Sequence, residues 1–151
     1  MDLSIIPEKL FKSGNGSTTC IVKYDFAHHI LEVVWLKLPT PLMLKNIVAY
    51  LVELYKTTNS TFILNDIRGV AGIWPMMINW SQKDKIPIND SVTWCMAILT
   101  DNVVQASMYG RYLAHYLSNT TLVESFENKQ DAINWLIDCQ NLKSISGCPL
   151  T

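Results

Sequence analysis

The sequence lacks a long apolar run and any excess of basic charge. No stretch approaches the ~20 consecutive apolar residues of a membrane-spanning helix, so we expect no integral membrane segment. Lysine and arginine number 12 against 13 acidic residues, and the net charge is -1. Without a basic excess to neutralise phosphates, nucleic acid and anionic membranes are not expected partners. The opening MDLSIIPEKLFKSG has an early acid and no long apolar core, unlike a secretory signal, so the expected location is cytoplasmic.

Motifs of metal binding and catalysis are also missing. The chain has no CxxC pair, no HExxH, no phosphate-binding loop and no nucleophile elbow. Cys20 and Cys95 lie inside apolar strand patterns and, like Cys139 and Cys148, are expected to be reduced thiols. His28, His29 and His115 have no carboxylate or cysteine placed to complete a triad or a ligand set. We therefore expect no metal and no cofactor, and a non-catalytic role is favoured over an enzyme.

What is present describes one globular domain. The chain has 151 residues, of which 49% are hydrophobic and 17% charged. This length suffices for a single core. We expect an N-terminal extension over 1–17 that ends in the flexible SGNGS, a domain over 18–139, and a C-terminal tail over 140–151.

Hydrophobic periodicity predicts the secondary structure of that domain. Residues 18–26 alternate apolar and polar side chains, which indicates a half-buried edge strand. Only AHH separates them from the apolar segment 30–36, so the two form an antiparallel hairpin. Thr40 and Pro41 mark the start of a helix that runs to about Lys56. Further strands are expected at 62–66, 91–100 and 121–126, and further helices around 75–82, over 102–117 and from Asn128.

This element order predicts a mixed five-stranded α/β sheet. The hairpin lies at one edge, and right-handed β-α crossovers follow it. If the strands are in sequential order, the crossover helices share one face. We expect the other face to be covered by the N-terminal extension, by the helix near Trp80 or by a second copy of the chain, and we favour partial self-cover with a homodimer.

Polar residues at two strand ends make the first candidate site. Asp66 and Arg68 follow the strand at 62–66, and Asp101 follows the strand at 91–100. Ligands of open α/β sheets gather outside the carboxyl ends of parallel strands, so these residues are candidates for a polar or anion-binding clamp. In the alternative interpretation, Asp66 accepts N–H bonds from the loop backbone and Arg68 pairs with a nearby carboxylate.

Aromatic residues provide the second set of candidates. Trp74, Met77 and Trp80 belong to a short apolar helix that either packs in the core or lines a ligand pocket. Three tyrosines, Tyr109, Tyr112 and Tyr116, sit beside the apolar stripe of their helix, which suits either an interface or the border of the core.

Several segments resemble the SpoIIAA-like branch of the STAS domains, which is related to Sec14 modules. They are YDF…ILEVVWL, the strand ending in LNDIRG, the AILTD strand end, and SFENKQDAINWL. The resemblance implies a bacterial, non-catalytic binding or signalling module built on a mixed sheet. In STAS antagonists of anti-sigma factors, a serine after the strand that ends in Asp is phosphorylated. No Ser or Thr lies between Asp66 and Trp80, so that switch is expected to be missing.

The expected function is therefore a binding or regulatory module with a protein partner or a small apolar or anionic ligand. One alternative is a small Sec14-like carrier of lipid or another apolar molecule. The other alternative is a hydrolase-type enzyme that uses Asp66 and Asp101.

Overall fold

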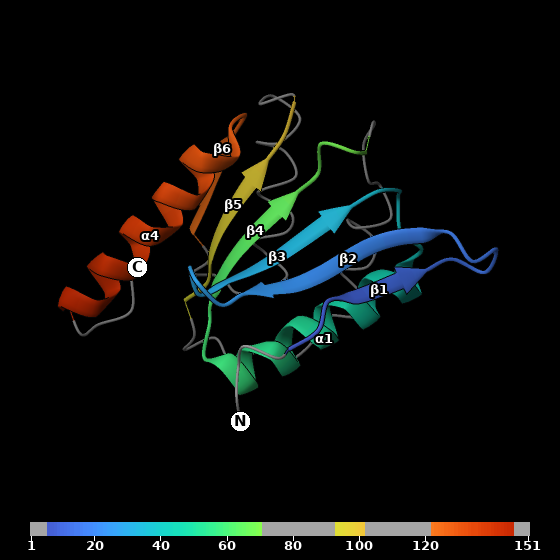
Figure 1. The fold of residues 1–151 in the computed structure, drawn as a ribbon, viewed down its shortest axis with the longest axis horizontal. Helices are drawn as coiled ribbons and strands as arrows, with labels where there is room; N and C mark the ends of the chain where they lie inside the picture. The colour runs from blue at the N-terminus through green and yellow to red at the C-terminus, as the bar shows by residue number, and fades with distance from the viewer. Residues whose placement is uncertain (1–5, 71–92, 102–121, 147–151) are drawn as a thin grey trace.

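The computed structural model describes residues 6–70, 93–101 and 122–146. Within these ranges the chain forms six strands and two helices (Figure 1). In chain order they are β1 (Lys9–Lys12), β2 (Thr18–Asp25), β3 (Ile30–Trp35), α1 (Pro41–Thr58), β4 (Phe62–Asp66), β5 (Cys95–Leu99), β6 (Leu122–Phe126) and α4 (Lys129–Ser146). The helices expected around 75–82 and over 102–117 lie outside the described residues.

All six strands join one mixed sheet in sequential order, β1 to β6. β2 pairs antiparallel with both β1 and β3, which confirms the expected hairpin. β3, β4, β5 and β6 are parallel neighbours. A parallel pair requires a crossover, and α1 supplies the one between β3 and β4.

The expected count of five strands is wrong, because residues 9–12 of the predicted extension form β1. Lys9 lies opposite Val22 and Phe11 opposite Cys20, so β2 is an interior strand rather than the edge. KLFK is too short to show an alternating pattern. Its two lysines suit an edge strand, since charged side chains there discourage pairing with other chains.

α1 begins and ends where local signals place its caps. The Thr40 hydroxyl accepts a hydrogen bond from the backbone N–H of Met43 at 3.2 Å, and Pro41 occupies the first turn. Asn59 ends the helix in the left-handed conformation, with its N–H 2.7 Å from the carbonyl of Tyr55. A buried stripe faces the sheet: Leu44, Ile47, Val48, Leu51 and Leu54.

The two helices cover opposite faces of the sheet (Figure 1). α1 packs on one face, against side chains such as Val33 and Ile63. α4 buries Ala132, Ile133, Leu136 and Cys139 on the other face, against β4 and β5. Among the described residues, α4 covers the second face over β4 and β5, which the sequence did not predict. Residues 9–12 of the expected extension join the sheet as β1 instead of covering a face. The helix expected near Trp80 lies outside the described residues, and cover by a second copy of the chain stays a prediction.

α4 also extends beyond the expected end of the domain. It starts after Asn128, whose side-chain oxygen accepts the backbone N–H groups of Gln130 and Asp131 at 2.8 and 3.1 Å. It continues past residue 139 to Ser146, so the first part of the expected tail is helical. Among the described helices, none is long and apolar enough to cross a membrane.

Candidate functional site

The candidate clamp lies where β4 ends. All five residues of β4 are buried, and the strand stops at Asp66. The backbone then turns, with the N–H of Val70 bonded to the carbonyl of Ile67 at 3.1 Å. In this turn Asp66 Oδ1 accepts the backbone N–H and the Nε–H of Arg68 at 3.1 and 3.0 Å, and Oδ2 accepts from Nη2 at 2.9 Å. The pair is a bidentate fork, the geometry that Arg and carboxylate groups favour.

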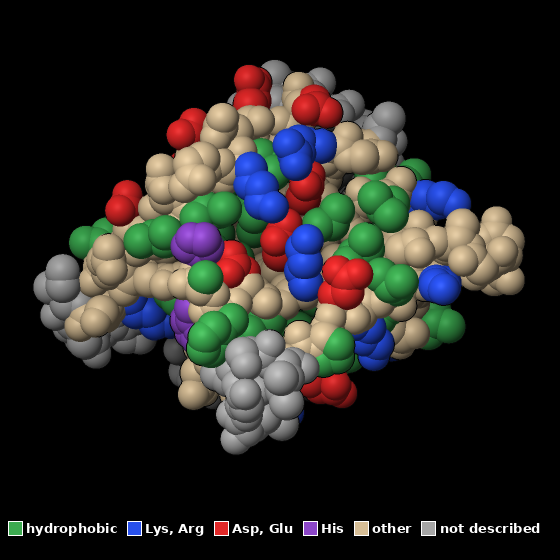
Figure 2. Space-filling model, viewed as in Figure 1, with side chains coloured by type: hydrophobic (Ala, Val, Ile, Leu, Met, Phe, Trp, Pro, Cys, Tyr) green, Lys and Arg blue, Asp and Glu red, His purple; other side chains and the backbone are tan. Residues whose placement is uncertain are grey.

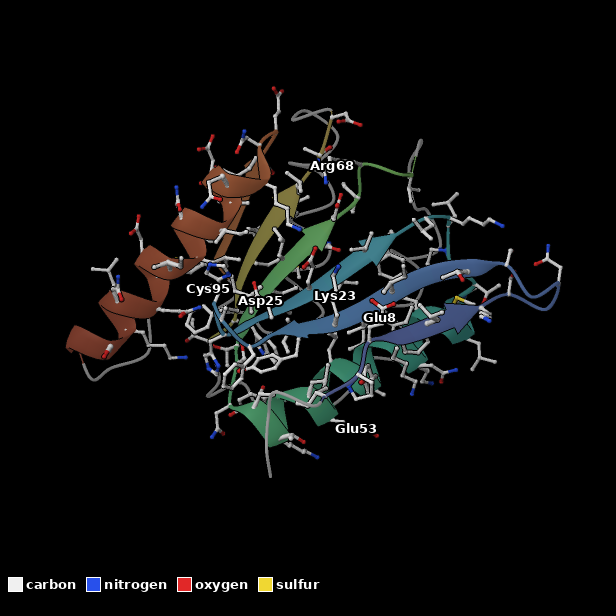
Figure 3. The ribbon with its side chains drawn as sticks, in the orientation of Figure 1. Glu8, Lys23, Asp25, Glu53, Arg68 and Cys95 are labelled. Atoms are coloured by element: carbon white, nitrogen blue, oxygen red, sulfur yellow. The ribbon has the colours of Figure 1, made fainter. Side chains whose placement is uncertain are left out.

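The fork holds a positive charge at the surface. The Asp66 side chain is 11% exposed and the Arg68 side chain 41% exposed. The hydrogen bond to Asp66 raises the pKa of Arg68, and the charges of Asp66, Asp101 and Glu32 act in the same direction, against a smaller loss from desolvation. The guanidinium is therefore permanently charged and fixed in orientation at the carboxyl edge of the sheet (Figure 3).

Asp101 lies at the same edge. β4 and β5 are parallel with Asp66 opposite Leu99, and Asp101 is exposed two residues farther on. The three polar residues predicted from the strand ends thus share one edge of the molecule. The contacts of Asp66 agree with the alternative interpretation, in which it accepts an N–H bond from the loop backbone and pairs with Arg68. A ligand or partner for Arg68 stays a prediction.

Exposed leucines follow the neighbouring strand at this edge, and the sequence did not single them out. Leu36, Leu38 and Leu42 are 43%, 42% and 69% exposed. They lie in and after the loop that leaves β3, the parallel neighbour of β4, so Leu36 follows directly at the same edge. Gly69 brings the two loops together, since a Cβ there would lie 2.8 Å from the carbonyl oxygen of Trp35. The signal in the sequence was the segment LKLPTPL, where leucines recur around two prolines between the end of β3 and the first turn of α1.

A second polar cluster crosses the sheet face that α1 leaves open. Glu32 is only 7% exposed, and its carboxylate lies 3.0 Å from Nζ of Lys129 and 4.0 Å from Nζ of Lys23. Figure 2 shows basic and acidic side chains gathered side by side in the middle of one face of the molecule. The signal in the sequence was the single acid of the apolar strand ILEVVWL.

The remaining candidates are either buried thiols or residues that lie outside the described ranges. Cys20 and Cys95 are buried and reduced, as expected, and burial raises the pKa of each thiol to about 12. Cys139 is also a free, buried thiol. The aromatic candidates, with His115 and Cys148, lie outside the described residues: Trp74, Met77, Trp80, Tyr109, Tyr112 and Tyr116.

The histidines of the hairpin turn have close partners. His28 Nδ1 lies 2.6 Å from Asp25, and His29 Nδ1 lies 2.7 Å from the hydroxyl of Tyr24. His29 is half-buried, whereas His28 is exposed. In the part of the chain with described coordinates, no three metal-ligating side chains come together.

The carboxyl edge therefore combines an exposed, fixed guanidinium, a nearby carboxylate and a group of exposed leucines. Each feature comes from the end of a parallel strand or from the loop that follows it. Comparison of the chain with models of protein families, with curated proteins and with solved structures gave no match.

Proposed function

We propose that this chain is a non-catalytic binding or regulatory module of the SpoIIAA-like, STAS type, and that its carboxyl edge receives a protein partner. The observation that carries the proposal is the fork between Asp66 and Arg68. Two guanidinium nitrogens, Nε and Nη2, bind Asp66 and so fix the orientation of the group, while the Arg68 side chain stays 41% exposed. A preoriented arginine loses little conformational entropy when it binds, which favours recognition.

The neighbouring leucines support a protein rather than a small ion as the occupant. Leu36, Leu38 and Leu42 offer apolar surface in the segment that leaves β3 at this edge, and Leu36 lies next to the loop that carries Arg68. Binding energy in protein interfaces concentrates in arginine and large apolar side chains that become desolvated together. The partner expected at this edge presents a carboxylate to Arg68 and apolar side chains to the leucines.

The geometry of Asp66 favours binding over hydrolysis. Both of its oxygens accept hydrogen bonds from Arg68, so the carboxylate is engaged as an ion pair rather than poised to take a proton. The segment after Asp66 also lacks the phosphorylatable serine, so partner binding in this proposal is not switched by phosphate.

Affinity enrichment from the host, read by quantitative mass spectrometry, tests the proposal. The wild-type chain is compared with Arg68→Ala, with Leu38→Ser, and with Leu142→Ser as control. Leu142 lies on α4 and is 56% exposed, so it is an exposed leucine like Leu38 but lies away from the carboxyl edge. We expect one protein to be retained by the wild type and the control and lost by the two edge variants, with affinity falling about 30-fold, the effect of losing a contact worth about 2 kcal/mol.

Retention of that protein by both edge variants would contradict the assignment of the carboxyl edge. Native mass spectrometry of the gently purified chain gives an independent reading. A stoichiometric bound lipid would favour the carrier function instead. A complex with twice the mass of the monomer would identify the partner as a second copy of the chain.

A further inference from the structure

A hollow of about 430 Å³ lies at the opposite edge of the sheet, where the parallel strands begin. The first residue of β4, Phe62, lines it together with His29 of the hairpin turn. The C-terminal half of α4 supplies the other lining residues: Gln140, Asn141, Lys143 and Ser144. The hollow is shallow and largely open to solvent, with a volume in the range of about 300–1,000 Å³ found for small-molecule sites.

Hydrogen bonds fix the wall that the hairpin turn provides. His29 has a left-handed backbone with a φ of 59°. Its carbonyl oxygen accepts from the hydroxyl of Ser60 at 2.7 Å, and its Nδ1 lies 2.7 Å from the hydroxyl of Tyr24. The Gln140 amide donates to the carbonyl of His28 at 2.9 Å and so ties α4 to the turn. These bonds hold the hairpin turn in place on one side of the hollow.

The floor combines an aromatic ring with a cation. Nζ of Lys143 lies 5.6 Å from the centroid of the Phe62 ring and 3.1 Å from the hydroxyl of Thr61. The ring of His29 lies 6.4 Å from the Phe62 ring, at an angle of 54°. A flat apolar body can contact both rings while a polar group reaches the ammonium.

The lining favours a negatively charged ligand. Of the six lining residues, Lys143 carries a full positive charge and none is acidic. Burial lowers the pKa of His29, so its imidazole is neutral at pH 7. Burial also raises the pKa of Tyr24, whose hydroxyl stays protonated. When that hydroxyl donates to Nδ1, the ring proton is on Nε2, which is then a hydrogen-bond donor.

We propose that this hollow binds a small organic anion with a flat apolar body, such as an aromatic carboxylate. The carboxylate pairs with Lys143, and the ring of the ligand lies against Phe62 and His29. This site is separate from the carboxyl edge and does not depend on the protein partner proposed there.

Titration of the full-length chain with benzoate, followed by ¹H–¹⁵N NMR, tests this site. Benzamide, the neutral analogue of the same shape, is titrated in parallel. We expect benzoate to give saturable shifts at His29 and at residues 140–144, with a dissociation constant in the millimolar range. Benzamide should bind at least about tenfold more weakly, because it lacks the charge-assisted bond to Lys143.

Two charge-matched variants complete the test. Lys143→Gln should weaken benzoate binding at least about tenfold, whereas Lys56→Gln, which removes one positive charge from the exposed side of α1, should leave it unchanged. The unliganded spectrum of each variant reports whether it folds, and Lys143→Arg keeps the charge if Gln disturbs the helix. Equal binding of benzoate and benzamide, equal behaviour of the two Gln variants, or shifts confined to other residues would overturn the proposal.

Discussion

Glu32 shows how a single residue depends on its partners. It lies on β3 with its carboxylate almost removed from water, between Lys129 and Lys23. A carboxylate in such a position is costly unless it is paired, so its partners matter more than those of an exposed acid. The closer of them, Lys129, comes from α4 and therefore also joins the helix to the sheet.

Lys129→Met should lower the free energy of unfolding by about 1–2 kcal/mol, because it leaves Glu32 with one partner at 4.0 Å. Lys23→Met should cost no more than about 0.5 kcal/mol, since that contact is longer and more exposed. Urea unfolding measures both. Adding Glu32→Gln to Lys129→Met should recover stability, and a double variant less stable than Lys129→Met would show that the charge of Glu32 is not the cause.

Asp66→Ala should destabilise the protein more than Arg68→Ala does. The first change removes the acceptor of three hydrogen bonds, including the one from the loop backbone, and should cost about 1–3 kcal/mol. The second leaves the backbone bond in place and should cost about 1 kcal/mol or less. Thermal unfolding of the two variants checks the order, and a larger loss for Arg68→Ala would place the stabilising contact elsewhere.

The sequence allowed the position of these residues to be predicted but not their contacts. Asp66 and Asp101 follow buried strands, and parallel pairing brings such strand ends to one edge. Whether Arg68 turns back to Asp66 or outward depends on rotamers and loop geometry, which composition does not encode. The exposure of Leu36, Leu38 and Leu42 was missed because Leu36 belonged to a strand predicted over 30–36, while Leu38 and Leu42 lie outside any periodic apolar pattern.

At the scale of elements, the loops at the carboxyl edge are held by close packing of backbone on backbone. Gly69→Ala should destabilise the protein by about 1–3 kcal/mol, because the new Cβ would lie 2.8 Å from the carbonyl of Trp35. Gly14→Ala is the matched control, since a Cβ there meets nothing within 4 Å. Chemical denaturation of the pair should show a loss for Gly69 alone. Equal denaturation midpoints for the two variants would mean that the loops after β3 and β4 can move apart with little loss of stability.

The start of α1 offers a second test at this scale. Thr40→Ala removes the acceptor for the N–H of Met43 and should cost about 0.5–2 kcal/mol. Thr57→Ala, near the other end of the same helix, should be neutral or slightly stabilising, because alanine has the higher helix propensity and Thr57 is exposed. Thermal unfolding distinguishes the two. A similar loss in both variants would show that the cap contributes nothing specific.

Elements with strong local signals were the ones predicted correctly. β4 is a buried run that ends in an acid, and α1 opens with Thr-Pro, so the prediction of each starting residue agrees with the structure. β1 was missed because four residues bearing two lysines carry no periodic pattern, and it pairs only because β2 offers a free edge. Such pairing is a tertiary effect that propensity alone does not anticipate.

For the molecule as a whole, the buried thiols predict how stability depends on pH. The pKa values of Cys20 and Cys95 are about 12 in the folded chain, above the value near 9 in the unfolded chain. Above pH 9 the unfolded chain therefore loses protons that the folded chain keeps. The free energy of unfolding should fall by about 1.4 kcal/mol per pH unit for each thiol between pH 9 and 12.

Replacing both residues by alanine isolates this contribution from the tyrosines and lysines that titrate in the same range. The double variant should be less stable at pH 7, because it loses buried volume, but its stability should fall less steeply above pH 9. Urea unfolding from pH 8 to 10.5 measures the two slopes. Parallel slopes would show that the thiols are not protected in the folded chain.

The run of α4 across the molecule links its two ends. The helix starts beside the carboxyl edge, where Lys129 reaches Glu32, and ends beside the hollow, where Gln140 meets the hairpin turn. From Lys129 to Lys143 it spans about 21 Å at a rise of about 1.5 Å per residue. Because it is anchored near both ends, the helix cannot tilt or slide without breaking one of these two contacts.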